Sequence, residues 1–206
     1  MKLTYSIMKI KVLQFLLIGL VIFISSCEKD GTINPEVLTN NKVEYNGENL
    51  SINAAGFVDY NLRSFYGNAP THKNVDFYTI DGTFITSKTG SLLDISGKSV
   101  VFAELNSPNL DMIETATYNY INDSKDSGLT DTELSAKYSG KYFFTNAYVI
   151  SSSQSSSLLT FSQNIDVVSG TVKISGSKPN YLITYDLVLE NGKTLKGNYA
   201  GIFQSL

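Results

Sequence analysis

The sequence predicts an all-β protein, built as an antiparallel β-sandwich or barrel of about ten short strands with at most one short helix. Three observations predict it. Apolar and polar residues alternate near the end of the chain, turn-forming dipeptides recur at short intervals, and the chain holds 13 Tyr and 11 Phe. Alternation with a period of two is typical of a strand with one buried face, and aromatic residues favour strands.

Turn signals divide the chain from residue 42 onward. Glycine follows Asn, Asp or Ser at residues 46–47, 81–82, 96–97 and 191–192, and such pairs favour the positive φ of a tight hairpin. Segments rich in β-branched and aromatic residues are predicted strands. They are residues 42–45, 48–53, 57–61, 74–80, 83–87, 98–105, 115–121 and 142–150. The serine-rich residues 151–157 are expected to form a polar loop.

One segment, residues 130–137, has a helical pattern. Thr130 and Glu133 have the spacing of a capping box, in which each residue satisfies a backbone N–H of the other. The segment is about two helical turns long, so we expect it to connect strands rather than to contribute a layer.

The closing residues give the clearest strand pattern. Residues 181, 183, 185, 187 and 189 are all apolar or aromatic, and they alternate with a mixed set. The alternation resumes after Asn191-Gly192, from residue 195 to residue 203. We therefore predict a hairpin with one buried side, preceded by a third strand over residues 170–175.

The first 26 residues have the layout of a secretory signal peptide. Lys2, Lys9 and Lys11 precede an apolar run at residues 12–24, and the segment holds no acidic residue. The run counts 13 residues, whereas a membrane-spanning helix needs about 20. Met1 and Met8 both fit as the start of this segment.

Cys27 is the single cysteine of the chain and stands directly after this segment. The residues Ile24-Ser25-Ser26-Cys27 resemble the lipobox of bacterial lipoproteins, in which small residues precede an invariant cysteine. The resemblance implies cleavage before Cys27 and a diacylglyceryl group on its sulfur. Two or three acyl chains hold a protein stably on a membrane. The expected partner is thus a membrane, reached through lipid on Cys27, and the expected location is the cell envelope.

Two further stretches resemble Bacteroidetes-type surface lipoproteins, a broad group of all-β proteins of which few have an assigned activity. Residues 28–31, Glu-Lys-Asp-Gly, are similar to the charged segment that directs such proteins to the outer leaflet of the outer membrane, and they equally fit a solvated tether. The second stretch, residues 169–201, includes Tyr181-Leu182-Ile183 and Gly197-Asn198-Tyr199. The resemblance implies an outer-membrane lipoprotein that is exposed at the surface, and it assigns no binding residue.

The predicted organisation is a signal peptide at residues 1–26, the lipidated Cys27 with a flexible tether to residue 42, and a single all-β domain at residues 43–206. Residues 28–42 are polar, contain Pro35 and lack periodicity. The full chain has 16 basic and 19 acidic residues. Removing the three basic residues of the signal peptide leaves 13 against 19, a net charge of −6.

Composition excludes several functional classes. The chain has no cluster of Lys and Arg after residue 11, so we expect no nucleic-acid partner. One Cys and one His remove most zinc, redox and triad arrangements, and no phosphate-binding, dinucleotide-binding or hydrolase motif occurs. We expect no cofactor and no enzymatic activity, with Glu104 and Glu114 as the residual carboxylate pair for a glycosidase. His72 is expected to be an exposed loop residue.

An acidic patch is the candidate metal site. Asp123, Asp126 and Asp131 supply the oxygen ligands that Ca²⁺ prefers. The acids do not alternate as in an EF-hand loop, and Lys125 stands among them, so a solvated loop is the favoured interpretation.

Tyrosines are the candidate ligand-binding residues, because an exposed ring can stack on a sugar while its hydroxyl forms hydrogen bonds. Those in or beside predicted turns are Tyr60, Tyr66, Tyr118, Tyr120, Tyr138 and Tyr142. The sequence favours a non-enzymatic binding or structural module, with a glycan or another envelope protein as its partner. A carbohydrate-binding accessory of a glycan-uptake system would expose a row of Tyr. A lipocalin-like carrier of an apolar ligand would enclose a pocket lined by Phe and Tyr.

Overall fold

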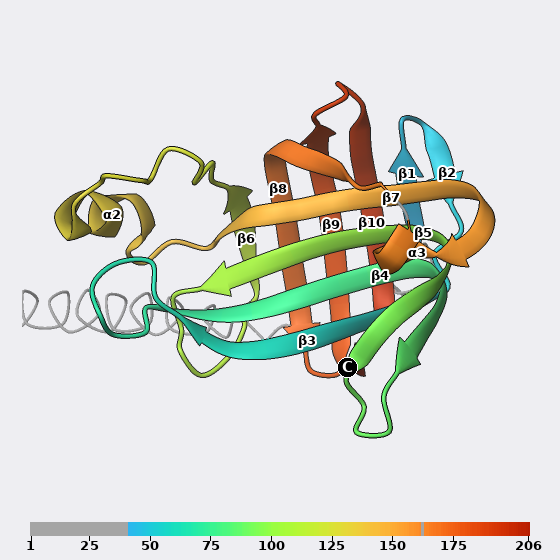
Figure 1. Ribbon diagram of the computed structural model, residues 1–206, viewed down its shortest axis with the longest axis horizontal. Helices are drawn as coiled ribbons and strands as arrows, with labels where there is room; N and C mark the ends of the chain where they lie inside the picture. Colours follow the sequence, from blue (N-terminus) through green and yellow to red (C-terminus); the bar gives the residue numbers. More distant parts are fainter. Residues whose placement is uncertain (1–40, 162) are drawn as a thin grey trace, which may run out of the picture. The chain divides into compact units, whose positions relative to one another are not determined.

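The computed structural model describes residues 41–161 and 163–206, which belong to one compact unit. The expected signal peptide, Cys27 and nearly all of the tether lie outside the described residues. The unit is all-β: eleven strands form one curled sheet, accompanied by one two-turn helix and one single helical turn (Figure 1). The predicted fold class is confirmed.

The strands follow one another along the chain with few intervening helices. They are β1 (Lys42–Tyr45), β2 (Glu48–Leu50), β3 (Ala54–Arg63), β4 (His72–Thr86), β5 (Leu92–Ser107), β6 (Ala116–Tyr120), β7 (Phe143–Ser157), β8 (Ile165–Ser177), β9 (Asn180–Leu189), β10 (Thr194–Ile202) and β11 (Gln204–Ser205). The helices are α2 (Asp131–Tyr138) and α3 (Leu158–Phe161). The spatial order is β11-β3-β4-β5-β7-β6-β8-β9-β10-β1-β2, and all neighbours are antiparallel except the pairs β11–β3 and β6–β7.

The curl brings two groups of strands face to face. In Figure 1, β3, β4, β5 and β7 run together across the view, and β8, β9 and β10 cross them at a steep angle. β7 pairs with β8 directly as well as through β6, so the sheet turns sharply there. The main core lies on the inner face of the curl, where Phe77 and Leu105 from the first group and Ile183 from the second have no exposed surface.

A second apolar cluster covers part of the outer face of the first group. Tyr78 of β4, Phe102 of β5 and Ile150 of β7 pack there with Leu158 of α3 and the C-terminal Leu206. β4 and β5 are therefore covered on both faces over this part of their length. Further along the same face the residues become polar, and that change positions the candidate site.

Two predicted hairpins are wrong. β4 continues through Asp81-Gly82 and β5 continues through Ser96-Gly97 without a turn. Gly82 pairs with Gly97 across the two strands at a register shift. A Cβ on Gly97 would lie 2.8 Å from the Cα of Gly82, which no side chain tolerates. These glycines allow two backbones to approach closely, whereas the same dipeptide pattern makes a turn elsewhere.

The other two predicted hairpins are confirmed. Asn46 and Gly47 both have positive φ, 53° and 84°, and join β1 to β2. Gly192 has a φ of 76° in the loop between β9 and β10, where Leu187 pairs with Leu195 as the alternation predicts. The third strand of this region is β8, which spans the predicted residues 170–175.

The serine-rich segment is a strand rather than the predicted loop. β7 continues to Ser157, and β5 pairs with it at Ser99–Ser151 and Ser96–Ser157. Serine has little strand preference of its own, so the backbone ladder to a long neighbouring strand determines the conformation.

The predicted helix is confirmed: α2 begins at Asp131, and Thr130 and Glu133 form the capping box. Among the described residues, no helix is long and apolar enough to cross a membrane.

Candidate functional site

A polar and aromatic depression lies on the outer face of β3, β4, β5 and β7, and we call it the outer-face hollow. Its volume is about 440 Å³. Strand alternation places its residues on one face, because Asn74 and Asp76 of β4 point outward while Val75 and Phe77 between and beyond them enter the core. The hollow is lined by Tyr60, Leu62, Arg63, Asn74, Asp76, Phe102, Glu104 and Asn146.

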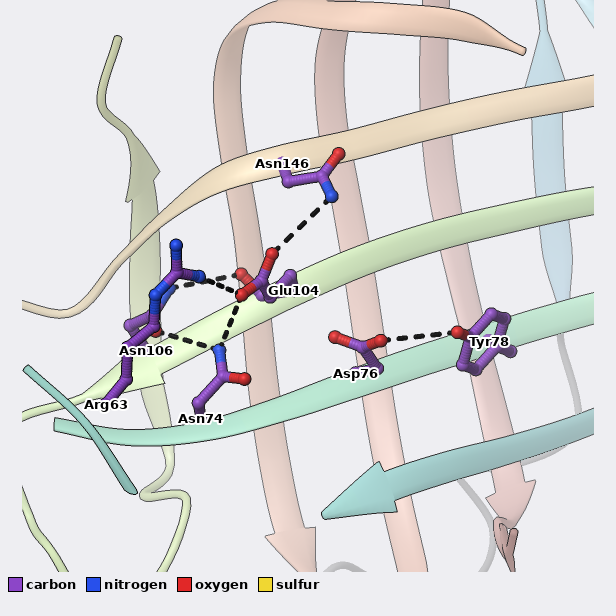
Figure 2. Close-up of polar contacts among 7 residues, drawn as sticks. All are labelled: Arg63, Asn74, Asp76, Tyr78, Glu104, Asn106 and Asn146. Carbon is purple, nitrogen blue, oxygen red and sulfur yellow. Dashed lines mark hydrogen bonds and ion pairs between the residues drawn. The ribbon is translucent and has the colours of Figure 1, made fainter. Parts of the chain in front are cut away.

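Glu104 is the centre of its hydrogen-bond network (Figure 2). One carboxylate oxygen accepts a hydrogen bond from Asn74 Nδ2 at 2.9 Å and forms an ion pair with Arg63. The other accepts from Asn146 Nδ2 at 3.5 Å. Asn74 also donates to Asn106 Oδ1 at 2.9 Å. Side chains from four strands therefore meet at one carboxylate, which fixes their positions relative to one another.

Asp76 stands directly opposite Glu104 in the register of β4 and β5. It is 7% exposed. Burial, followed by repulsion from Glu104, raises the pKa of Asp76 to about 7, although a hydrogen bond from Tyr78 and the charge of Arg63 act in the opposite direction. Tyr78 Oη donates to Asp76 Oδ2 at 3.3 Å. The hollow thus contains a carboxyl group that titrates near neutral pH.

Aromatic rings from three neighbouring strands continue the hollow along the same face. The centroid of Phe102 lies 5.1 Å from that of Tyr78 and 4.6 Å from that of Tyr148, with which it stacks. Burial first, and the charge of Asp76 second, raise the pKa of Tyr148 to about 12, so its hydroxyl keeps its proton at neutral pH. Tyr60 is 58% exposed at the edge of the hollow.

The predicted tyrosines are not gathered in one exposed row. Tyr60 lines the hollow, whereas Tyr118 and Tyr138 are buried and offer no ring face to solvent. Tyr118 Oη donates to the carbonyl oxygen of Glu114 at 2.9 Å, which ties the ring into the core. Tyr66, Tyr120 and Tyr142 are half-buried outside the hollow.

The carboxylate pair also differs from the one considered in the sequence. Glu114 accepts a hydrogen bond from Tyr142 Oη at 2.7 Å, and the acid opposite Glu104 is Asp76. Sequence reasoning missed Asp76, Arg63 and Asn146. One signal was available. Polar residues occur at every second position on the outer face of β4 and β5, whereas a strand face that packs against apolar neighbours carries apolar residues.

The three candidate calcium ligands make separate local contacts. Asp126 forms an ion pair with Lys137 and accepts a hydrogen bond from Tyr138 Oη. Asp131 accepts from the backbone N–H of Gly67 at 3.1 Å. Asp123 accepts through its carbonyl oxygen from the N–H of Asp126 at 3.0 Å. Within residues 41–161 and 163–206, no group of three or more His, Cys, Asp or Glu side chains is placed to hold a metal ion.

His72 is buried, which corrects the expectation of an exposed loop residue. The ring is 0% exposed and lies edge-on to Phe65 and Phe143, with centroids 5.3 and 5.0 Å away. Burial lowers the pKa of His72, and hydrogen bonding to the backbone of Tyr138 and Lys141 opposes the shift. Phe143 comes from a distant part of the chain, so the residues around His72 gave no sign of that contact.

Comparison of the chain with protein-family models, curated proteins and solved structures finds no match. Function is therefore inferred from the sequence and from the geometry of the hollow.

Proposed function

We propose that this protein is a lipid-anchored lipoprotein of the cell envelope, attached to the outer membrane through Cys27, and that it binds a glycan without acting as an enzyme. The basic start, the apolar run and the lipobox-like residues before Cys27 support the anchor. The outer-face hollow supports the binding activity, because its chemistry matches a polyhydroxylated ligand.

A sugar presents apolar ring faces surrounded by hydroxyl groups. The exposed ring of Tyr60 offers apolar surface, and a tyrosine combines such surface with a polar tip. Glu104 supplies acceptors, while Asn146 and Arg63 supply donors within the same depression. The meeting of an exposed ring, acceptors and donors in one open hollow is the observation that carries this proposal.

Charge favours a neutral glycan over an acidic one. Arg63 is already paired with Glu104, and Asp76 adds a second carboxyl group that ionises near neutral pH. The net charge of −6 expected for the mature chain acts in the same direction. A uronic acid or sulfated polymer would meet repulsion at this face.

Packing of the inner face argues against the lipocalin-like alternative. A carrier of that kind holds its ligand inside the curl, yet Phe77, Leu105 and Tyr185 fill that space with 0%, 0% and 1% exposure. The ligand is therefore better placed on the outer face.

A glycosidase is the second candidate, because Asp76 and Glu104 stand opposite each other. Directly paired residues have Cβ atoms about 5 Å apart, close to the carboxyl separation of about 5 to 5.5 Å in retaining glycosidases. Asp76 is 7% exposed, whereas Glu104 is partly exposed and accepts hydrogen bonds from three donors. Binding is favoured because Asp76 is too buried to act on a glycosidic bond, which leaves Glu104 without the second carboxyl group that hydrolysis needs.

The test is a screen of the chain from residue 27, with Cys27→Ser to keep it free of acyl chains, against neutral and acidic polysaccharides. We expect retention by at least one neutral polysaccharide, and Tyr60→Ala should weaken that affinity about tenfold because it removes the exposed ring. Ile202→Ala is the matched control, since Ile202 is an apolar residue of β10 that is 70% exposed. The proposal would be contradicted if no polysaccharide in the panel binds the protein, or if Tyr60→Ala binds as tightly as the wild type. Release of reducing sugars by the wild type would also contradict it.

A further inference from the structure

A second cavity lies at one open end of the main core, and we call it the core-end pocket. Its volume is about 320 Å³, at the lower end of the range for small-molecule sites. Phe57 of β3, Val75 of β4 and Tyr181 of β9 form its apolar floor, and they are 3%, 5% and 8% exposed. The pocket is thus an extension of the interlayer core that opens to solvent.

The floor is rigid and one wall is adaptable. The rings of Phe57 and Tyr181 meet edge-on with centroids 6.3 Å apart, and both also contact Phe77. The wall comes from the connection between β5 and β6, which contributes Met112, 58% exposed, and Ile113. Methionine adjusts readily to the shape of an apolar group.

Four charged residues also line the pocket, two of each sign. Lys73 Nζ pairs with Asp59 Oδ1 at 2.7 Å. Lys178 Nζ lies 4.7 Å from the centroid of the Phe57 ring, directly above the apolar floor. Asp111 stands in the adaptable wall, where its N–H donates to Asn109 Oδ1 at 2.9 Å and so holds the loop.

The arrangement leaves Lys178 and Asp111 as the charges available to a ligand. Asp59 pairs with Lys73 and is also attracted by the more distant charge of Lys178. Within residues 41–161 and 163–206, neither Lys178 nor Asp111 takes part in an ion pair with another side chain. A ligand with a net charge would leave one of these two groups without a counterpart. A ligand with one anionic and one cationic group would satisfy both.

We propose that the core-end pocket binds a small zwitterion that carries an apolar side group, the chemistry of a free amino acid such as phenylalanine or leucine. The side group would lie on Phe57, Val75 and Tyr181, the carboxylate would face Lys178, and the ammonium would face Asp111. This site is separate from the outer-face hollow and does not depend on glycan binding.

Three probes with the same ring separate the contributions of the two charges. L-Phenylalanine carries both groups, 3-phenylpropionate lacks the ammonium, and 2-phenylethylamine lacks the carboxylate. Calorimetric titration of the chain from residue 27 with Cys27→Ser should give the tightest binding for phenylalanine and about tenfold weaker binding for each of the others. L-Leucine should bind as well, because the floor is apolar rather than specific for a ring.

Variants assign the charges. Lys178→Gln should lower the affinity for phenylalanine about tenfold and leave that for 2-phenylethylamine unchanged, and Asp111→Asn should do the same with 3-phenylpropionate as the unaffected probe. Lys173→Gln is the matched control, since Lys173 is an exposed lysine of β8 outside the pocket.

Absence of phenylalanine and leucine binding at millimolar concentration would overturn the proposal. Equal affinity for the three ring probes, or unchanged affinity in both pocket variants, would also overturn it. Glu104→Gln should leave phenylalanine binding intact, which keeps this result independent of the glycan screen.

Discussion

Asp76 is a buried carboxyl group in direct register with a second acid, and its protonation should make stability depend on pH. Its folded-state pKa of about 7 lies above the ordinary value of 3.8, so the folded protein binds the proton more tightly than the unfolded chain does. Stability due to this group therefore falls as pH rises from about 4 to about 7 and then stays constant. Three pKa units correspond to an upper limit of about 4 kcal/mol.

Asp76→Asn should remove this cost while keeping the shape of the side chain. We expect the free energy of unfolding to exceed that of the wild type at pH 8, by at most about 4 kcal/mol, and to match it near pH 4. Urea denaturation at the two pH values measures this. Asp111→Asn, at an exposed acid, should change little at either pH. A difference between wild type and Asp76→Asn that is the same at pH 4 and pH 8 would show that the effect does not come from ionisation.

The hollow illustrates which residue contacts a sequence reveals. Alternation assigns Asn74 and Asp76 to one face of a strand, and the chemistry of Tyr60 makes it a ligand candidate. The pairing of Asp76 with Glu104 depends on the register between β4 and β5. Alternation does not determine that register, because a shift by any even number of residues keeps the same side chains on each face. The contribution of Asn146 depends on β7 lying next to β5, although two other elements separate them in the chain.

The long strands β4 and β5 show where local patterns mislead at the scale of elements. Asp81-Gly82 and Ser96-Gly97 are typical of turns, and nothing within either segment distinguishes them from Asn46-Gly47. What distinguishes them is that Gly82 and Gly97 face each other. A glycine selected for close backbone approach and one selected for positive φ look alike in a single sequence. The closing hairpin and the capped helix were predictable because their determinants are local.

Gly97→Ala tests this explanation. Its Cβ would lie 2.8 Å from the Cα of Gly82 and closer still to the carbonyl oxygen of Asp81. We expect the two strands to be forced apart, with a loss of about 2 to 4 kcal/mol in the free energy of unfolding. Lys98→Ala, at the exposed neighbouring position, should stay within about 0.5 kcal/mol of the wild type. Thermal or urea unfolding gives the comparison, and a Gly97→Ala protein as stable as the wild type would refute the close-approach role.

At the scale of the whole molecule, the proposal combines an anchor expected from the sequence with a candidate binding face on the folded domain. The anchor requires acyl chains on Cys27, because the preceding apolar run is too short for a permanent membrane-spanning helix. Cys27→Ala should therefore move the protein from the membrane fraction to the soluble fraction. Immunoblotting of separated fractions measures this, with Ser26→Ala as a control that keeps a small residue before the cysteine. Membrane attachment of Cys27→Ala equal to that of the wild type would contradict the anchor.

The central claim is that the outer-face hollow receives the glycan. A crystal structure of the protein soaked with an oligosaccharide from the polysaccharide retained in the screen tests it most directly. The account predicts a sugar ring against Tyr60, with hydroxyl groups bonded to Glu104 and Asn146. A sugar ordered on another surface, with the hollow occupied by water alone, would contradict it.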